Sequence, residues 1–234
     1  MIIAGVDGCP AGWLCITKNV DTGRIRAETY PSARALIAQT PRPEIIAIDI
    51  PIGLTDRGPR ECDKAARVYL KEPRRRSVFP TPIRPALYAS SREEASEKNH
   101  EADGRRIGVQ TWAIVPKIRQ VDEVLRNHPE LQSVIREVHP EVSFAAWNND
   151  QPMRHSKKKP QGRNERMALV EGTYGQTIFT DIRSKYLVRQ VGHDDIWDAF
   201  AALWTAERIF AGCAQTLPPN PPKDSEGHSM EMVY

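Results

Sequence analysis

Runs of apolar residues near the start of the chain predict β-strands. Four segments there have the length and apolar content of strands, namely residues 2–6, 12–17, 24–30 and 44–50. Turn residues between the first three segments predict two hairpins, so these strands should pair antiparallel. Ser32 opens a short predicted helix over residues 33–39, after which the fourth strand can lie parallel beside the first.

The remainder of the chain is predicted to be mostly helical. Five segments favour helices, namely residues 60–71, 93–105, 110–126, 164–174 and 194–211. Pro116 should break or kink the third of these helices. Four prolines within residues 72–85 predict a long basic loop, and residues 134–138 are the last expected strand.

These elements predict an α/β fold with one large domain over residues 1–211. Its mixed five-stranded sheet should have the order 3-2-1-4-5 and helices around it. A helical and basic-loop insertion is expected around residues 56–130. Residues 212–234 are rich in proline and polar residues, so we expect an extension without a packed core of its own.

Neither a membrane helix nor a secretory signal is predicted. The longest clean apolar stretch, residues 1–6, is far shorter than the about 18 residues of a membrane helix, and it has no basic leader or cleavage site. The four cysteines show neither CxxC nor zinc-finger spacing, so no disulfide framework is expected. We therefore expect a cytoplasmic protein with no membrane partner.

The net charge of +3 conceals two strongly basic segments. Residues 57–76 and residues 154–166 each carry a net charge of +5, so the rest of the chain is acidic. This separation of charge suits an anionic partner, although ordinary solvated loops would give the same pattern.

Acidic residues fall where predicted strand ends and a helix start should meet. Asp7 closes the first strand, Asp49 lies near the end of the fourth, and the pair Asp195 and Asp198 opens the last helix. If the two strands are parallel neighbours, Asp7 and Asp49 emerge at one edge of the sheet, and a helix packed there would add its two acids. Clustered carboxylates repel one another unless cations neutralise them, and their oxygens suit Mg²⁺ or Mn²⁺.

Each acidic residue also has a simpler interpretation. An Asp before Gly, such as Asp7, is common in turns. Acids at a helix start interact favourably with the helix dipole, which accounts for Asp195 without any metal. Asp49 is harder to explain in this way, because a charged side chain in a buried strand needs a partner.

The order of the motifs resembles a known family. The segments GVDGCPAGW, DIPIGL, RECD followed by AR, EVHPEVSF and DDIWDAFAA resemble an uncharacterised bacterial and archaeal family of predicted RNase H-like nucleases, related to RuvC-type resolvases. The resemblance spans residues 2–211 and implies an RNase H-like fold. It also implies acids on the first strand, the fourth strand and the last helix, which map to Asp7, Asp49, Asp195 and Asp198.

Further residues complete the predicted site. Glu137 ends the fifth strand at the same edge and is a candidate ligand or water-orienting base, or else a solvent-facing residue. His139 is a candidate acid for the leaving oxygen or a structural residue. Basic residues in a position to bind substrate phosphates are Arg60, Arg67, Lys158, Lys159, Arg163 and Arg166.

These features predict a metal-dependent phosphodiester hydrolase, a nuclease acting on DNA or RNA. Two Mg²⁺ or Mn²⁺ ions about 4 Å apart would drive the reaction. The predicted catalytic residues are Asp7, Asp49, Glu137, Asp195 and Asp198. Two alternatives stay open: a protein of the same fold that binds nucleic acid or a partner without catalysis, and a hydrolase of a small phosphoester. In the binding alternative, Trp112 and Trp147 would stack on bases, or they are ordinary core residues.

Overall fold

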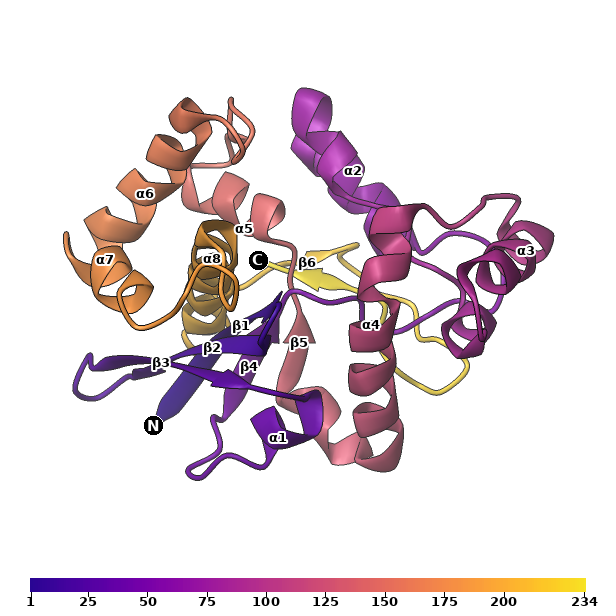
Figure 1. The fold of residues 1–234 in the computed structure, drawn as a ribbon, viewed down its shortest axis with the longest axis horizontal. Coiled ribbons are helices and arrows are strands. Elements are labelled where there is room, and N and C mark those ends of the chain that lie inside the picture. Colours follow the sequence, from indigo (N-terminus) through magenta and orange to yellow (C-terminus); the bar gives the residue numbers. More distant parts are fainter.

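A five-stranded mixed sheet lies at the centre of the fold (Figure 1). The structure is a computed structural model that describes all 234 residues. The sheet contains β1 (Ile2–Cys9), β2 (Gly12–Asn19), β3 (Ile25–Tyr30), β4 (Ile45–Ile48) and β5 (Ile135–Glu137). Its order is β3-β2-β1-β4-β5, with antiparallel pairing among the first three strands in the chain and parallel pairing of β1 with β4 and of β4 with β5. The predicted α/β class and strand order are confirmed.

Helices cover both faces of the sheet. They are α1 (Ala33–Ile37), α2 (Glu61–Arg74), α3 (Arg92–Asp103), α4 (Val109–Asn127), α5 (Pro140–Trp147), α6 (Pro160–Tyr174), α7 (Ile178–Arg183) and α8 (His193–Phe210). Short 3₁₀ turns are η1 (Arg75–Ser77), η2 (Arg84–Tyr88) and η3 (Pro129–Ser133), and a small second sheet pairs β6 (Thr216–Leu217) with β7 (Met232–Val233). None of these helices combines the length and the apolar character needed to cross a bilayer.

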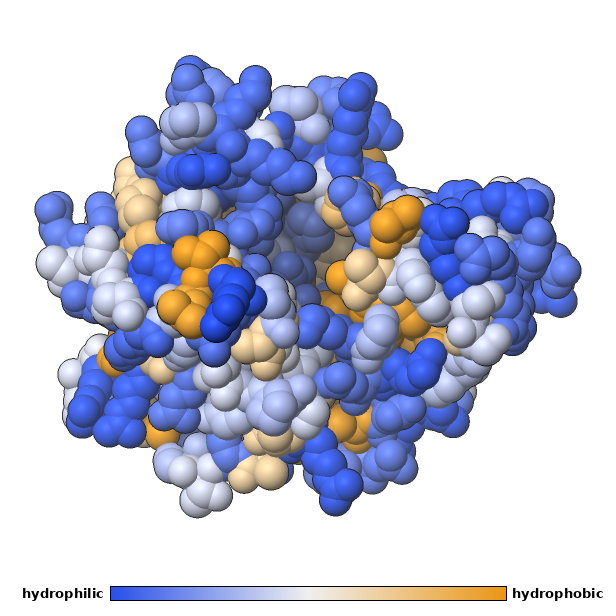
Figure 2. All heavy atoms as spheres, viewed as in Figure 1, coloured by the Kyte–Doolittle hydropathy of each residue, from blue (hydrophilic) through white to orange (hydrophobic).

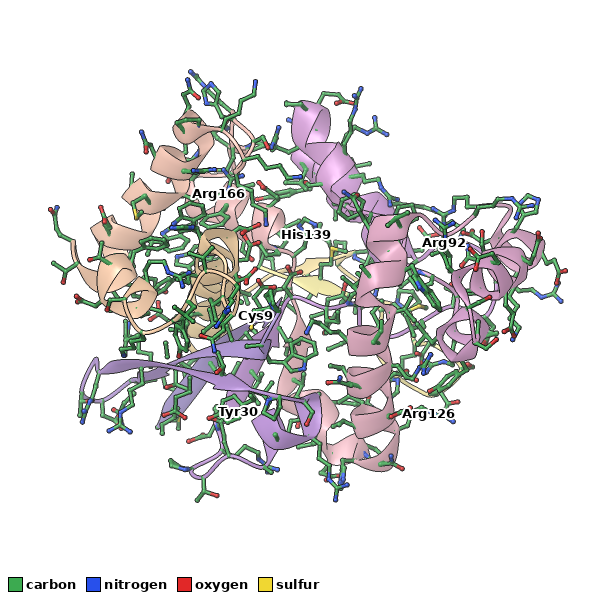
Figure 3. All side chains as sticks on the ribbon, viewed as in Figure 1. Cys9, Tyr30, Arg92, Arg126, His139 and Arg166 are labelled. Carbon is green, nitrogen blue, oxygen red and sulfur yellow. The ribbon has the colours of Figure 1, made fainter.

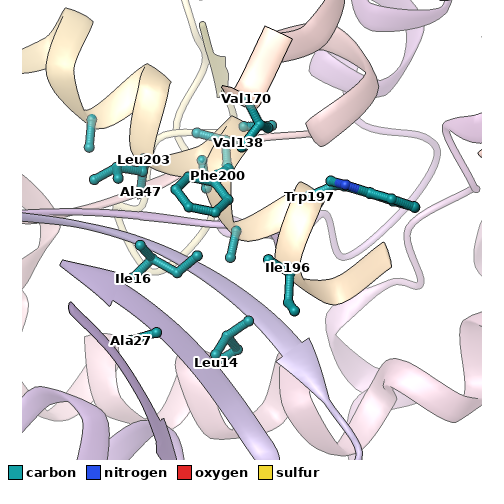
Figure 4. Packing of buried hydrophobic residues seen from close by; sticks show 14 of the residues in the cluster. Leu14, Ile16, Ala27, Ala47, Val138, Val170, Ile196, Trp197, Phe200 and Leu203 are labelled. Atoms are coloured by element: carbon teal, nitrogen blue, oxygen red, sulfur yellow. The ribbon is translucent and has the colours of Figure 1, made fainter. Parts of the chain in front are cut away.

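The alternation of residues along the strands divides the core into two layers. Ile3 and Leu14 belong to a buried cluster with Phe200 of α8, which is seen from close by in Figure 4. Their neighbours Ala4 and Val6 belong to a second cluster, with residues of α1 and α4. Successive strand residues point to opposite faces, so odd-numbered positions of β1 meet α8 and even-numbered ones meet α4.

Gly5 allows α8 to lie directly against β1. A Cβ atom at Gly5 would lie 2.0 Å from the backbone nitrogen of Leu203 and 2.3 Å from the carbonyl oxygen of Ala199. Only glycine leaves room for this contact. The close approach brings the first half of α8 over the end of β1, where Asp7 lies.

Some local predictions are wrong. Asp7 does not close β1, because β1 and β2 continue to pair as far as Cys9 and Gly12. Pro116 does not break α4, because apolar residues on both sides of it, such as Val115, continue to pack in the core. The sequence also gave no prediction for α5 or α7. The predicted loop after residue 71 does interrupt regular structure, since α2 is kinked at its end and only short 3₁₀ turns follow.

The C-terminal segment packs against the insertion between β4 and β5. Met230, Met232 and Tyr234 join a buried cluster with residues of α2 and α5. Asp224 forms an ion pair with Arg84 and accepts a hydrogen bond from a backbone N–H of the segment after β4. Residues 212–234 therefore share a buried cluster with α2 and α5.

Candidate active site

Three aspartates meet at the carboxyl edge of the parallel strands. Asp7 lies on β1, and Asp49 directly follows β4, where its N–H donates to the carbonyl oxygen of Val6 at 2.9 Å. Asp7 continues the odd-numbered face of β1, and Asp198 lies in the second turn of α8, the helix that covers this face. All three aspartates line one cavity of about 510 Å³.

The three carboxylates oppose one another's ionisation. Burial, followed by the charges of Asp49 and Asp198, raises the pKa of Asp7 well above its usual value. Burial and the charge of Asp198 raise the pKa of Asp49 in the same way, and burial raises the pKa of Asp198. Such a group needs a positive charge beside it before all its members ionise at neutral pH.

Lys157 supplies positive charge inside this cluster. Its Nζ forms an ion pair with Asp198 and lies 3.8 Å from Oδ2 of Asp194. Burial lowers the pKa of Lys157, but the carboxylates of Asp198 and Asp7 outweigh burial and raise the pKa above its usual value. Lys157 therefore carries its proton throughout the neutral range. The sequence places Lys157 in the basic segment 154–166, but nothing in its run of three lysines distinguishes it, so it was not among the predicted site residues.

Arg166, from the same basic segment, holds the loop that carries Lys157. Arg166 is buried, donates to the carbonyl oxygens of His155 and Gly162 at 3.2 and 2.7 Å, and pairs with Glu141 at 2.5 Å. Figure 3 shows Arg166 on α6. The predicted phosphate contact by Arg166 is therefore wrong, because its side chain is enclosed in the protein.

The other three basic residues predicted in this segment differ in position. Lys158 lines the cavity beside Lys157. Lys159 is exposed and does not line it. Arg163 is exposed as well, and its guanidinium donates to the backbone carbonyls of Lys157 and Lys158 at 3.4 Å. Lys158 is thus the one of the three that the structure places beside the acidic cluster.

Arg60 and Glu137 form a buried ion pair. The two guanidinium NH₂ groups of Arg60 lie 2.7 and 2.8 Å from the Glu137 oxygens, and the other side of the guanidinium bonds to Asp63. Further Arg60 hydrogen bonds go to the carbonyls of Ile52 and Gly53. Every donor of Arg60 is used, so its predicted contact with substrate phosphate is wrong.

Glu137 fixes the segment that follows Asp49. Its Oε2 accepts the backbone N–H of Ile52 at 2.5 Å in addition to the bonds from Arg60. Burial raises the pKa of Glu137 to about 7, although Arg60 opposes this shift. Glu137 also lines the cavity, but these bonds give it the role of a positioning residue rather than of a free ligand.

Two more predicted residues have backbone partners. Asp195 accepts the N–H of Gly192 at 2.7 Å and so caps α8, and it does not line the cavity. Burial raises its pKa to about 6. Asp195 therefore fits the simpler interpretation of the sequence, in which an acid at the start of a helix needs no metal. Arg67 donates to the carbonyl oxygen of Val78 at 3.1 and 3.0 Å and holds the loop after α2.

His139 lies on the cavity between α5 and α2, near the centre of Figure 3. Its Nε2 is 3.3 Å from the carbonyl oxygen of Ser77, and its Nδ1 is buried without a hydrogen-bond partner. Burial lowers the pKa of His139, so the ring is neutral at neutral pH. With Nε2–H donating to Ser77, Nδ1 is a free acceptor rather than the proton donor that the sequence suggested.

The donor chemistry of the cluster fits a divalent cation. The carboxylates of Asp7, Asp49 and Asp198 are hard oxygen ligands whose mutual repulsion a cation relieves. In this conformation, however, no three His, Cys, Asp or Glu side chains converge on one metal position. Asp198 is paired with Lys157, which supplies the charge that a metal ion would supply. Binding of one ion by all three aspartates therefore requires side-chain movement from this conformation, and the ion would compete with Lys157 for Asp198.

The tryptophans considered for base stacking belong to the core. Trp147 stacks on Trp204 with ring centroids 5.5 Å apart and on Phe144 at 5.9 Å. Trp112 packs against the buried cluster on the other side of the sheet and against a second one formed within residues 83–107. Neither residue lines the cavity.

A comparison with protein families gives one match. Residues 5–223 match the family model described as "Protein of unknown function (DUF429)". No curated protein and no solved structure gives a significant match. The matched region includes all three aspartates of the cavity and Lys157.

Proposed function

The chain belongs to the DUF429 family, and we propose that it is a metal-dependent phosphodiester hydrolase that acts at the cavity of Asp7, Asp49 and Asp198. One observation carries this proposal: three carboxylates with raised pKa values, of which Asp7 and Asp198 are buried, line one cavity, and only Asp198 has an ion-pair partner, the ammonium group of Lys157. Buried charges that serve only stability are normally balanced. Unbalanced ones with perturbed pKa values mark functional sites.

The positions of the acids support an RNase H-like interpretation of the fold. One acid lies on β1, one follows β4, and one lies on the last long helix, α8. These are the positions that the sequence resemblance implies. The strand order β3-β2-β1-β4-β5 agrees with the same interpretation.

The side chains divide the chemistry among them. Asp7, Asp49 and Asp198 would hold the ion, which when bound acts as a Lewis acid and lowers the pKa of a water molecule. Lys157, once released from Asp198, and its neighbour Lys158 would balance the charge of the substrate phosphate.

A cleavage assay tests this proposal. Labelled single- and double-stranded DNA, RNA, an RNA–DNA hybrid and a four-way junction are incubated with Mg²⁺ or Mn²⁺, and separately with EDTA. We expect metal-dependent cutting that Asp7→Asn reduces at least about 100-fold. Asp56→Asn, an exposed aspartate outside the cavity, should leave the rate unchanged. The proposal would be contradicted if none of these substrates is cut, or if Asp7→Asn still cuts them.

The size of the cavity favours a second candidate, hydrolysis of a small phosphoester. About 510 Å³ is in the range of small-molecule sites. The assay therefore includes a chromogenic phosphodiester and nucleoside monophosphates. Metal-dependent hydrolysis of one of these, without cutting of any polynucleotide, would identify this second function.

A further inference from the structure

An exposed aromatic ring stands between the acidic cavity and a second hollow. Phe79 is 48% exposed and lines both. The second hollow has a volume of about 460 Å³. The residues that line both hollows are Phe79, Pro80, Pro82, Gln110 and Thr111. The two hollows are therefore parts of one continuous surface that passes Phe79.

The backbone on either side of Phe79 is held in place. The carbonyl oxygen of Val78 accepts two hydrogen bonds from Arg67. On the other side, the N–H of Thr81 donates to Asp63 at 3.1 Å. Pro80 follows Phe79 directly, Pro82 comes two residues later, and both restrict the loop further. Phe79 is thus an apolar ring presented to solvent on a fixed support, unlike a ring on a loose loop.

The charges around the ring suit an anionic chain. The acidic cavity has Arg74 and Lys158 among its lining residues. The second hollow contains Arg106 and no acidic residue in its lining. The Arg106 side chain is 59% exposed and forms a surface ion pair with Glu97 at 3.0 Å, and such an exposed pair is weak enough to open for a phosphate. Figure 2 shows a hollow in the middle of the molecule, with hydrophobic atoms gathered along its α4 side. In a nucleic-acid strand each base lies between two phosphates, so an apolar ring between basic side chains can contact the base while the basic side chains contact the phosphates.

We propose, building on the proposed function, that Phe79 stacks on the base of an unpaired nucleotide whose phosphate lies at the acidic cluster. The adjoining nucleotide then continues into the second hollow toward Arg106. Inside a duplex both faces of each base are covered by neighbouring bases, so the ring has a partner only in an unpaired nucleotide. The site therefore prefers single strands, or nucleotides, to duplexes.

Binding measurements test this inference separately from catalysis. Single strands, a duplex of the same sequence and a mononucleotide are titrated with Ca²⁺ in place of Mg²⁺ or Mn²⁺, because the carboxylates of the cavity repel a phosphate when no cation is bound. Fluorescence of a 2-aminopurine base is the signal, and gel analysis checks that the strands stay intact. We expect Phe79→Ala to weaken single-strand binding about 5- to 100-fold and Phe79→Trp to retain it. Val68→Ala, at a 76% exposed residue of α2 that lines neither hollow, is the matched control and should change nothing.

The source of the nucleotide is distinguished by a second variant. Arg106→Ala should weaken binding of the single strand and leave binding of the mononucleotide unchanged if a strand occupies both hollows. Equal affinity of mononucleotide and strand identifies a free nucleotide as the ligand.

Two results overturn the stacking inference: a duplex bound as tightly as the single strand, or binding by Phe79→Ala equal to that of the wild type. Metal-dependent cleavage together with either result would leave the proposed hydrolase intact. Phe79-dependent binding without any cleavage would instead reject the hydrolase and retain the stacking.

Discussion

Two groups of charged side chains line the same cavity and differ in their balance. In the first, Arg60 lies between Asp63 and Glu137, and the three side chains are at most 3% exposed. Every donor of the guanidinium has an acceptor. In the second, Asp198 has an ion pair with Lys157, while two more aspartates of the cavity have no cation of their own.

The difference assigns separate roles to the two groups. A balanced, fully hydrogen-bonded group fixes structure, and it holds the segment after Asp49 through the N–H of Ile52. An unbalanced group is unfavourable in the absence of a ligand, and it gains when a cation enters. The balanced group therefore positions one member of the unbalanced one. Glu137 belongs to the balanced group, so its carboxylate is already paired with Arg60 and is not free to bind a metal ion.

Breaking the balanced group should have the largest effect. Arg60→Met leaves Asp63 and Glu137 buried without their cation, and we expect the free energy of unfolding to fall by about 3–5 kcal/mol. Chemical denaturation measures this change. Lys64→Met is the control, because Lys64 pairs with Glu61 at the surface, with side chains 50% and 59% exposed, and should cost less than about 1 kcal/mol. A loss in Arg60→Met as small as in the control would contradict the structural role of the balanced group.

Removing the cation of the unbalanced group should have an intermediate effect. Lys157→Met leaves Asp198 unpaired, but the Lys157 side chain is 31% exposed, so we expect a loss of only about 1–3 kcal/mol without metal. The same variant removes the competitor for the aspartates, so Mn²⁺ should raise its Tm more than it raises that of the wild type. Thermal denaturation with and without Mn²⁺ measures both effects.

Lys158→Met provides the matched control for this prediction. Lys158 lines the same cavity but forms no ion pair with a carboxylate. It should therefore leave both the metal-free stability and the response to Mn²⁺ near those of the wild type. An equal Mn²⁺ response in Lys157→Met and Lys158→Met would show that Lys157 does not occupy the position of a cation.

The acidic cluster was largely predictable from the sequence because strand ends and helix spacing are local patterns. Asp7 and Asp49 follow from two parallel strands, and Asp198 follows from its place near the start of the last helix. The partners of buried charges were not predictable in this way. Whether Arg60 bonds to substrate or to Glu137, 77 residues away, depends on tertiary contacts that no local pattern contains.

Prediction of the fold from local sequence patterns has the same limit. The strand order followed from hairpin turns and one helical crossover. The burial of Met230, Met232 and Tyr234 did not, because this short apolar stretch follows a segment rich in proline and polar residues that predicts no packed element. Their partners lie on α2 and α5, far away in the sequence. Contacts of this kind bring the C-terminal segment, and with it Met232, to the cavity.

The smallest effect should come from relieving repulsion within the unbalanced group. Burial and neighbouring carboxylates raise the pKa of Asp7 in the folded protein, so the folded state binds a proton more tightly than the unfolded chain does. Stability of the metal-free protein should consequently fall as the pH rises from about 4, the pKa of an unfolded Asp, through the raised folded value. Asp7→Asn lacks this titration and should be more stable than the wild type at pH 7, by on the order of 1 kcal/mol. The difference should vanish below about pH 4, and Asp56→Asn should show none. Denaturation curves across this pH range measure the difference. A clear loss of stability in Asp7→Asn at pH 7 would contradict the repulsion between carboxylates that the cavity geometry implies.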